Sequence, residues 1–241
     1  EDSVNEYEGS FEESPYLGNR GYLPHQKPRA AYAAMITRMD RDIGRLLKAL
    51  EETGKADNTL VVFSSDNGPS WVGGVDWEFF ESRGGLRGRK AQLYEGGIRV
   101  PTIVSWPGKV ASGTESAAVS AFWDWMPTFL DAADVSQELA VLGDNQLDGK
   151  SLLPILQSQS KNWPDRTLYW EHNRQWQAML HGDWKLLRKN QKSAWELFNL
   201  ADDPAEAKDL AEEFPLKVNE LAELLTQQRV ESDLHPLKTS S

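Results

Sequence analysis

The sequence predicts an α/β protein that ends in a small antiparallel subdomain, and three patterns lead to this prediction. From residue 28, apolar residues recur at steps of three and four until Gly54, as on one face of a helix. The short apolar runs "NTLVVFSS" (58–65) and "RVPTIVSW" (99–106) follow and indicate buried strands of a parallel sheet. After residue 162, the stretches "TLYWEH", "QWQAML", "DWKLLR" and "WELFNL" indicate four antiparallel strands between polar turns.

These patterns divide the chain into three segments. Residues 1–27 are rich in Gly, Pro, Glu and Ser without a period, and we expect a loop that continues from a missing N-terminal part. Residues 28–161 are expected to form an α/β domain, which includes a helix over 121–133 with a kink at Pro127. Residues 162–241 are expected to form the antiparallel subdomain with a terminal helix.

Composition excludes several classes of function. The 241 residues carry a formal charge of −11, which disfavours a general nucleic-acid or anionic-membrane surface. No apolar run reaches the roughly 18 residues of a membrane span. The absence of cysteine excludes disulfides, thiolate metal sites and thiol nucleophiles.

The first candidate site follows the strand over 58–65. Asp66 and Asn67 stand where open α/β sheets bind ligands, beyond the carboxyl end of a strand. Their carboxylate and amide oxygens are hard donors that suit Ca²⁺ or Mg²⁺. The alternative is that "DNG" is only a favoured turn. Two ligands are also too few for Ca²⁺, which takes about six to eight oxygens, so others must come from elsewhere.

The second candidate is the stretch "RGGLRGRKAQLYEGGIRVP" (83–101). Although the chain as a whole is acidic, four cationic residues fall within eight positions of this stretch, namely Arg83, Arg87, Arg89 and Lys90. Its glycines allow the backbone to approach a ligand closely. Such a cluster suits an anionic substrate. A solvated loop is the alternative for most of these arginines, and a nucleic-acid-binding RGG segment is a further one, although such segments normally repeat.

Taken together and in this order, the two stretches resemble the core of the formylglycine-dependent sulfatases, which belong to the alkaline-phosphatase-like superfamily. "AAYAAMITRMDRDIGRLLKAL", "LDGKSLLPIL", "GDWKLL" and "ELFNLADDPAEAKDLA" are similar to other signatures of that family. The resemblance covers roughly residues 28–210. It implies the C-terminal part of an alkaline-phosphatase-like α/β fold with mixed or parallel strands, and it favours the metal site over the turn.

The resemblance also implies roles for particular residues. Asp66 and Asn67 match the family's metal ligands, usually for Ca²⁺, with Mg²⁺ as the alternative. Lys90 matches the lysine that contacts the sulfate, where an ammonium group stabilises negative charge that develops during ester cleavage. Trp71 and Trp77 lie in the loop after the metal ligands and are candidates for substrate binding, with plain packing as the alternative.

Other expected parts are uncertain or missing. His172 belongs to a segment that in many relatives reaches the active site, where an imidazole could protonate the leaving oxygen, but it is equally a candidate for a structural residue. The formylglycine nucleophile, made from Cys or Ser in a C/S-x-P-x-R motif, has no counterpart. Ser105 in "SWPGK" matches the family's downstream turn instead. We therefore expect the formylglycine in the missing N-terminal part, and we expect this chain alone to be inactive.

The expected function is a sulfatase fragment that acts with its own N-terminal half on a sulfated small molecule or carbohydrate. The alternatives are a catalytically dead remnant that serves as a binding module, and a phosphodiesterase or phosphonate hydrolase of the same superfamily. The family resemblance implies a periplasmic or secreted location. We expect no signal peptide within these 241 residues, because no stretch resembles a cleavable leader.

Overall fold

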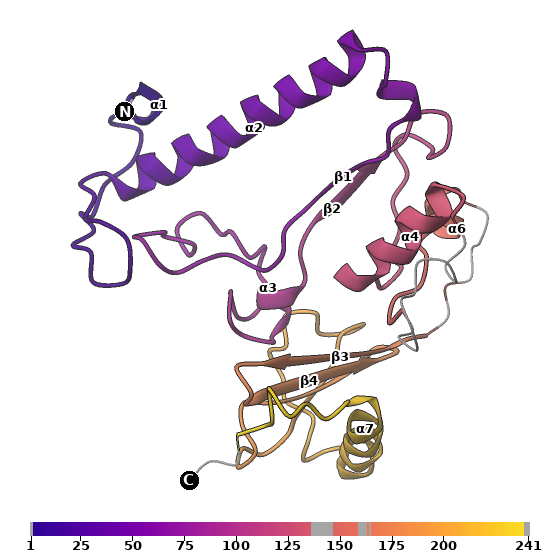
Figure 1. The fold of residues 1–241 in the computed structure, drawn as a ribbon. Helices are drawn as coiled ribbons and strands as arrows, with labels where there is room; N and C mark the ends of the chain where they lie inside the picture. Colours follow the sequence, from indigo (N-terminus) through magenta and orange to yellow (C-terminus); the bar gives the residue numbers. More distant parts are fainter. Residues whose placement is uncertain (1, 136–146, 159–162, 164, 239–241) are drawn as a thin grey trace.

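The structure is a computed structural model, and it describes residues 2–135, 147–158, 163 and 165–238. A long helix and a two-stranded sheet occupy one part of the molecule, and a four-stranded sheet with one helix occupies the other (Figure 1). A glycine-rich loop (residues 83–97) that ends in the short helix α3 (Glu95–Ile98) lies between them (Figure 1). The structure thus contains the predicted mixture of helices and strands and the predicted antiparallel subdomain, and the α/β class is confirmed.

The N-terminal segment is irregular except for the short helix α1 (Asp2–Asn5). Phe11 packs edge-on against Phe79 and Phe80, with ring centroids 5.9 Å and 5.5 Å away. Tyr16 and His25 exchange backbone hydrogen bonds of 2.8 Å and 2.9 Å. Aromatic packing therefore holds this loop to the rest of the molecule, and the Tyr16–His25 bridge closes the loop on itself.

Helix α2 (Pro28–Glu52) matches the predicted helix closely. Proline stands at its first position, where the missing N–H costs nothing, and Gly54 follows its end with φ +65°. The Glu13 carboxylate accepts hydrogen bonds from the Arg29 and Ala30 N–H groups at 3.0 Å and 2.8 Å. A carboxylate at this end satisfies two otherwise unpaired donors and complements the helix dipole.

Strands β1 (Val61–Ser64) and β2 (Thr102–Ser105) form where the two apolar runs predict them. They pair with each other in antiparallel register, so the expectation of parallel neighbours is wrong for this pair. They are also not buried on both faces, because Phe63 is 38% and Ile103 is 63% exposed. An apolar run indicates a strand but does not identify its partner or what covers it.

The segment after β2 forms the 3-10 turn η2 (Phe122–Asp124) and helix α4 (Trp125–Ala132), and α6 (Leu153–Leu156) packs nearby. Pro127 lies in the first turn of α4, so the predicted kink is absent and the helix simply begins later. The fully buried Asp124 accepts hydrogen bonds from both terminal nitrogens of Arg166, at 2.5 Å and 2.8 Å. This bidentate ion pair joins η2, directly before α4, to the start of the second sheet.

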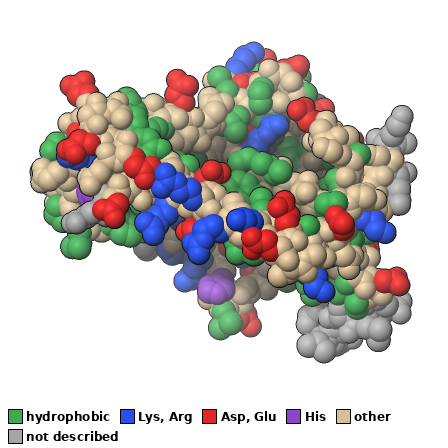
Figure 2. Space-filling model, turned by 90° about the horizontal axis from the view of Figure 1, so that it is seen from above, with side chains coloured by type: hydrophobic (Ala, Val, Ile, Leu, Met, Phe, Trp, Pro, Cys, Tyr) green, Lys and Arg blue, Asp and Glu red, His purple; other side chains and the backbone are tan. Residues whose placement is uncertain are grey.

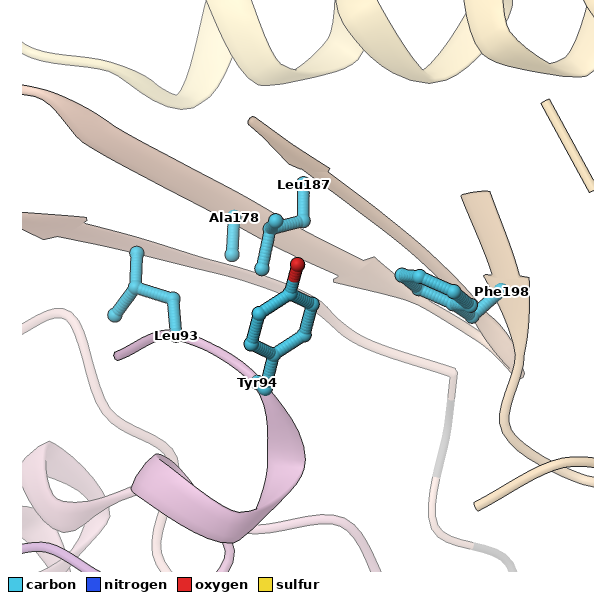
Figure 3. Close-up of a cluster of buried hydrophobic side chains, with 5 residues drawn as sticks. All are labelled: Leu93, Tyr94, Ala178, Leu187 and Phe198. Carbon is cyan, nitrogen blue, oxygen red and sulfur yellow. The ribbon is translucent and has the colours of Figure 1, made fainter. Parts of the chain in front are cut away.

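The second sheet is the predicted meander, with strand order β3-β4-β5-β6 and antiparallel pairing throughout. Helix α7 covers one of its faces and buries Leu221 and Leu225 there. The other face packs on Leu93 and Tyr94 of the glycine-rich loop (Figure 3). The four strands and the helix have these bounds: β3 Thr167–His172, β4 Trp176–His181, β5 Trp184–Arg188, β6 Glu196–Asn199 and α7 Pro215–Gln228.

Burial on both faces explains the apolar runs of the meander, because consecutive side chains point to opposite faces. Met179, Leu186 and Leu197 contribute to the core under α7. Their neighbours Ala178, Leu187 and Phe198 contribute to the core with the loop, shown in Figure 3. Among the described residues, no helix is both long and apolar enough to cross a membrane.

Candidate active site

Asp66 and Asn67 lie in the turn directly after β1. The Ser65 hydroxyl donates to the Asn67 carbonyl oxygen at 2.8 Å, and the Asn67 side-chain nitrogen donates to the Gly68 carbonyl oxygen at 3.1 Å. With its nitrogen engaged, the amide has its oxygen available to a ligand. The Asp66 side chain is exposed and has no hydrogen bond or ion pair within the described part of the chain.

Gly68 holds this turn against helix α3 (Glu95–Ile98). Its N–H donates to the Gly97 carbonyl oxygen at 2.9 Å. A Cβ atom at position 68 would lie 1.9 Å from the Gly96 carbonyl oxygen, so no other residue fits without displacing backbone. The "DNG" and "EGG" motifs are therefore two sides of one backbone-to-backbone contact.

Lys90 is brought to the same turn by its own backbone. Its N–H donates to the Pro69 carbonyl oxygen at 3.0 Å, and the Gly96 N–H donates to the Arg87 carbonyl oxygen at 2.6 Å. The Lys90 side chain is exposed, and no described residue pairs with its ammonium group. The loop that carries one unpaired ammonium group thus contacts, through its backbone, the turn that carries an unpaired carboxylate and a free amide oxygen.

The three arginines of this loop are engaged by aromatic rings. The Arg89 guanidinium lies 4.0 Å from the Trp71 ring centroid, and that of Arg87 lies 4.0 Å from Tyr94. Arg87 also pairs with the Glu196 carboxylate at 3.4 Å. The third arginine, Arg83, has its guanidinium 4.5 Å from the Trp77 ring centroid. The predicted cationic cluster therefore consists of three arginines with structural contacts and one cation without a partner among the described residues, Lys90.

Trp71 and Trp77, the two tryptophans singled out from the sequence, lie on the wall of one cavity of about 360 Å³. The loop around Tyr16 forms the opposite wall. The cation–π contacts with Arg83 and Arg89 give both rings a structural role.

His172 ends β3, where it pairs in register with Trp176. The Trp176 ring packs edge-on against Tyr94 with centroids 5.7 Å apart, which brings the hairpin toward the loop of Lys90. No contact among the described residues joins the His172 side chain to Asp66 or to Lys90.

Sequence reasoning missed a buried ionic cluster behind the loop. The ammonium group of Lys185, fully buried in β5, lies 2.8 Å from carboxylate oxygens of both Glu95 and Glu206. The Glu206 carboxylate also accepts a hydrogen bond from the Glu95 N–H at 2.6 Å. Burial raises the pKa of Glu206, while Lys185 opposes that shift. The lysine within the apolar strand "WKLL" is the signal that could have revealed this cluster.

The oxygen donors of the turn after β1 suit a hard divalent cation. Asp66 and Asn67 offer two hard oxygens without protein partners, which suits Ca²⁺ or Mg²⁺. The described residues contain no cluster of three or more His, Cys, Asp or Glu side chains that could hold a metal ion. The described chain therefore fits part of such a site, and further oxygen ligands are needed.

Two family models match this chain. The model described as Sulfatase matches residues 2–135, and that described as N-sulphoglucosamine sulphohydrolase, C-terminal, matches residues 88–232. Together they cover both parts of the fold and the loop between them. This chain belongs to the sulfatase family.

Individual relatives agree with this assignment. The N-acetylglucosamine-6-O-sulfatase of Bacteroides thetaiotaomicron is 31% identical over 216 residues, which are 84% of this chain and 36% of that protein. The solved structure of Ps i-CgsB in complex with k-i-k-neocarrahexaose superposes with a TM-score of 0.70 at 27% identity, covering 84% of this chain and 43% of that one.

The structure of BT4656 in complex with its substrate D-glucosamine-2-N,6-O-disulfate has a TM-score of 0.64 at 29% identity. It covers 84% of this chain and 40% of that one. The chain thus spans less than half the length of each of these three relatives, and it has the alkaline-phosphatase-like fold of the sulfatases.

Proposed function

We propose that this chain supplies part of the active site of a sulfuric ester hydrolase. The observation that carries the proposal is the backbone hydrogen bond that joins the Lys90 loop to the turn of Asp66 and Asn67. The Asp66 carboxylate, the Lys90 ammonium group and the Asn67 amide oxygen have no protein partners among the described residues, whereas the Asn67 amide nitrogen donates to the Gly68 carbonyl oxygen. Unpaired polar groups on two loops that contact each other are typical of binding sites rather than of structural turns.

Lys90 is proposed to bind the sulfate group of the substrate. Cleavage of a sulfate ester increases negative charge on the sulfate oxygens and on the leaving oxygen, and a fixed ammonium group stabilises that charge. Asp66 and Asn67 are proposed to hold a Ca²⁺ ion, with Mg²⁺ as the alternative. When bound, such a cation supplies further electrostatic stabilisation of the same oxygens.

The nucleophile and the remaining metal ligands are proposed to come from polypeptide outside this chain, namely an N-terminal half that carries the formylglycine. Two findings support this. The chain spans less than half of its relatives, and apolar side chains of α2 and the β1–β2 sheet are open to solvent. Figure 2 shows hydrophobic side chains exposed between charged ones on the face seen from above. The exposed apolar side chains of α2 and the β1–β2 sheet are Met35, Ile36, Met39, Leu46, Leu47, Phe63 and Ile103.

The proposed substrate class is a sulfated carbohydrate. One relative is an N-acetylglucosamine-6-O-sulfatase, and another was solved with D-glucosamine-2-N,6-O-disulfate as its substrate. Trp71 and Trp77 are proposed to contact the substrate, and His172 is proposed as a further contact from the C-terminal sheet. A periplasmic or secreted location is proposed from family membership, and fractionation of the source cells tests it.

The test is sulfatase activity of the protein purified from its source, together with its intact mass. We expect a mass above 27.2 kDa and hydrolysis of 4-nitrophenyl sulfate or a sulfated monosaccharide. Lys90→Ala should lower kcat/KM about a hundredfold, comparable to the loss of one oxyanion donor. Lys109→Ala, an exposed lysine in a turn after β2, is the matched control and should have no effect. A Lys90→Ala variant within twofold of wild type contradicts the assignment.

The metal role has its own measurement. Asp66→Ala in the same purified protein should abolish stoichiometric Ca²⁺, determined by elemental analysis, because the site loses its only carboxylate from this turn. Asp57→Ala, on the exposed turn before β1, is the control. Full Ca²⁺ content in Asp66→Ala would show that the ion is held elsewhere.

A non-catalytic binding module is the second candidate function. A native species of 27.2 kDa without activity, but with sugar binding, would favour it over the enzyme. A preference for phosphate diesters or phosphonates over sulfate esters would instead indicate a phosphodiesterase or phosphonate hydrolase of the same superfamily.

A further inference from the structure

Lys90 depends on the backbone of its loop for its position, because its ammonium group has no partner among the described residues. The base of the loop is closed by the hydrogen bond of 2.6 Å from the Gly96 N–H to the Arg87 carbonyl oxygen. A Cβ atom at Gly97 would lie 2.6 Å from the Arg89 carbonyl oxygen, so α3 packs directly on the backbone beside Lys90. The residues that hold Arg87 and α3 therefore also hold Lys90.

Glu206, in the turn after β6, contacts both ends of this loop. Its carbonyl oxygen accepts a hydrogen bond from the Arg87 guanidinium at 3.0 Å. Its carboxylate accepts one from the Glu95 N–H at 2.6 Å. Arg87 stands three residues before Lys90 and Glu95 stands five residues after it. A single residue of the C-terminal part thus bridges the two ends of the segment that carries Lys90.

Glu206 is itself held in place. It is fully buried, its carboxylate lies 2.8 Å from the Lys185 ammonium group, and its N–H donates to the Asp203 carbonyl oxygen at 3.1 Å. Its φ of +55° lies in the left-handed region, which residues other than glycine rarely adopt. Backbone strain of this kind concentrates at functional sites. A buried, paired and constrained residue is a fixed anchor for the loop that it contacts.

The other fully buried carboxylate with an ion pair, Asp124, provides a contrast. It accepts hydrogen bonds from the N–H groups of Ala121 and Lys150 and from the Arg166 guanidinium. Among the described residues, none of these partners belongs to the loop of Lys90 or to the turn of Asp66. Burial of an ion pair therefore does not by itself connect a residue to the proposed site, whereas the two contacts of Glu206 do.

We propose that Glu206 is a positioning residue of the proposed active site, which fixes both ends of the loop that presents Lys90 to the sulfate. This role rests on the proposed function, because it explains how the proposed sulfate-binding lysine is held. Displacement of a catalytic group by about 1 Å costs up to about a hundredfold in rate. Glu206 acts through Lys90 and is not expected to touch the substrate.

The first experiment is a double-mutant cycle in the intact protein purified for the activity test. Glu206→Ala should lower kcat/KM for 4-nitrophenyl sulfate about tenfold in the presence of Lys90, and less than twofold in the Lys90→Ala background. A residue that only stabilises the fold would lower the activity by the same factor in both backgrounds. Glu206→Ala leaves Lys185 paired with Glu95 at 2.8 Å, so the ammonium group keeps a carboxylate partner.

The second experiment measures the order of the loop without reference to activity. Hydrogen exchange followed by mass spectrometry reports on the amides of Lys90, Gln92 and Gly96, which donate backbone hydrogen bonds within and beside the loop. Their exchange should be at least tenfold faster in Glu206→Ala. Arg87→Gln releases the other anchor without removing the buried carboxylate, and it should also accelerate exchange, which keeps the test informative where Glu206→Ala is poorly folded.

Two controls match these variants. Arg166→Lys weakens the buried pair with Asp124, because lysine keeps the charge and loses the bidentate contact. Glu213→Ala removes an exposed carboxylate of the same part of the chain, paired only with Lys208 among the described residues. Both should leave kcat/KM and the exchange of the loop within twofold of wild type, and circular dichroism confirms that each variant is folded.

The outcomes separate this inference from the proposed function. Equal losses in the two backgrounds, or unchanged exchange of the loop in both Glu206→Ala and Arg87→Gln, overturn the positioning role, even if Lys90→Ala is inactive. Accelerated exchange in Glu206→Ala, together with wild-type activity of Lys90→Ala, supports the anchoring of the loop by Glu206 and contradicts the sulfate role of Lys90.

Discussion

Individual glycines decide the geometry of the site. Gly68, Gly96 and Gly97 are required because a side chain at each would meet backbone oxygen at 1.9 Å, 2.6 Å and 2.1 Å, respectively. None of the three needs a left-handed backbone, so the requirement is space and not conformation. The Asp66–Asn67 turn and the Lys90 loop are held together at this contact.

This requirement gives a prediction for Gly68→Ala. The added methyl group must displace the Gly96 carbonyl, so we expect a loss of about 1–3 kcal/mol in the free energy of unfolding, as for overpacking. Urea denaturation measures it. Gly44→Ala is the control, because nothing lies within 4 Å of its Cβ position in α2, and it should stabilise the helix by about 1 kcal/mol. Equal stabilities of the two variants would contradict the packing argument.

At the scale of elements, an ionic cluster and an apolar core join the glycine-rich loop to the four-stranded sheet. Lys185 of β5 pairs with Glu95 of α3 and with Glu206, and Tyr94 packs on Phe198 of β6. The Tyr94 hydroxyl also donates to the Glu196 carboxylate, and burial together with that contact raises the pKa of Tyr94 to about 12. The sheet thus supports the loop that carries Lys90, although it is distant in sequence.

Removal of the buried ammonium group should be costly. Lys185→Met leaves two buried carboxylates without their cation, so we expect a loss of about 3–5 kcal/mol in the free energy of unfolding. Lys189→Met is the matched control, because this lysine is 44% exposed and its pair with Glu196 should contribute less than about 1 kcal/mol. Thermal or urea denaturation distinguishes them. A Lys185→Met loss no larger than that of Lys189→Met would contradict the structural role of the cluster.

At the scale of the whole molecule, burial is unequal. The four-stranded sheet is covered on both faces, whereas α2 and the β1–β2 sheet carry large apolar side chains that are open to solvent. Exposed apolar patches of this kind mark interaction surfaces or aggregation sites. The position of the unpartnered Asp66 at the end of β1 puts this surface beside the proposed active site.

The exposed surface should be detectable in solution. We expect the isolated chain to bind a hydrophobic dye and to self-associate, and the double variant Met35→Glu/Met39→Glu to reduce both at least twofold. These side chains are 62% and 49% exposed in the structure. Leu216→Glu is the matched control, because it is 83% exposed on α7, away from this surface, and should change neither property. Dye fluorescence and light scattering provide the measurements. An unaltered signal in the double variant would show that this surface is not responsible.

The sequence by itself determined the elements and the family. The 3.6-residue period of apolar side chains predicted α2, the two apolar runs predicted β1 and β2, and the short aromatic stretches between polar turns predicted the meander. All of these depend on local patterns of side chains. The motifs around Asp66 and Lys90 indicated a sulfatase, and family membership is confirmed. The roles of Asp66, Asn67, Lys90, Trp71, Trp77 and His172 remain predictions.

Only the tertiary structure decided the rest. The antiparallel pairing of β1 with β2, the glycine contact that brings Lys90 to the Asp66 turn, the buried Lys185 cluster and the cavity between Tyr16 and Trp77 all join distant segments. Local patterns cannot encode such contacts, because which surfaces meet depends on how the elements pack in space.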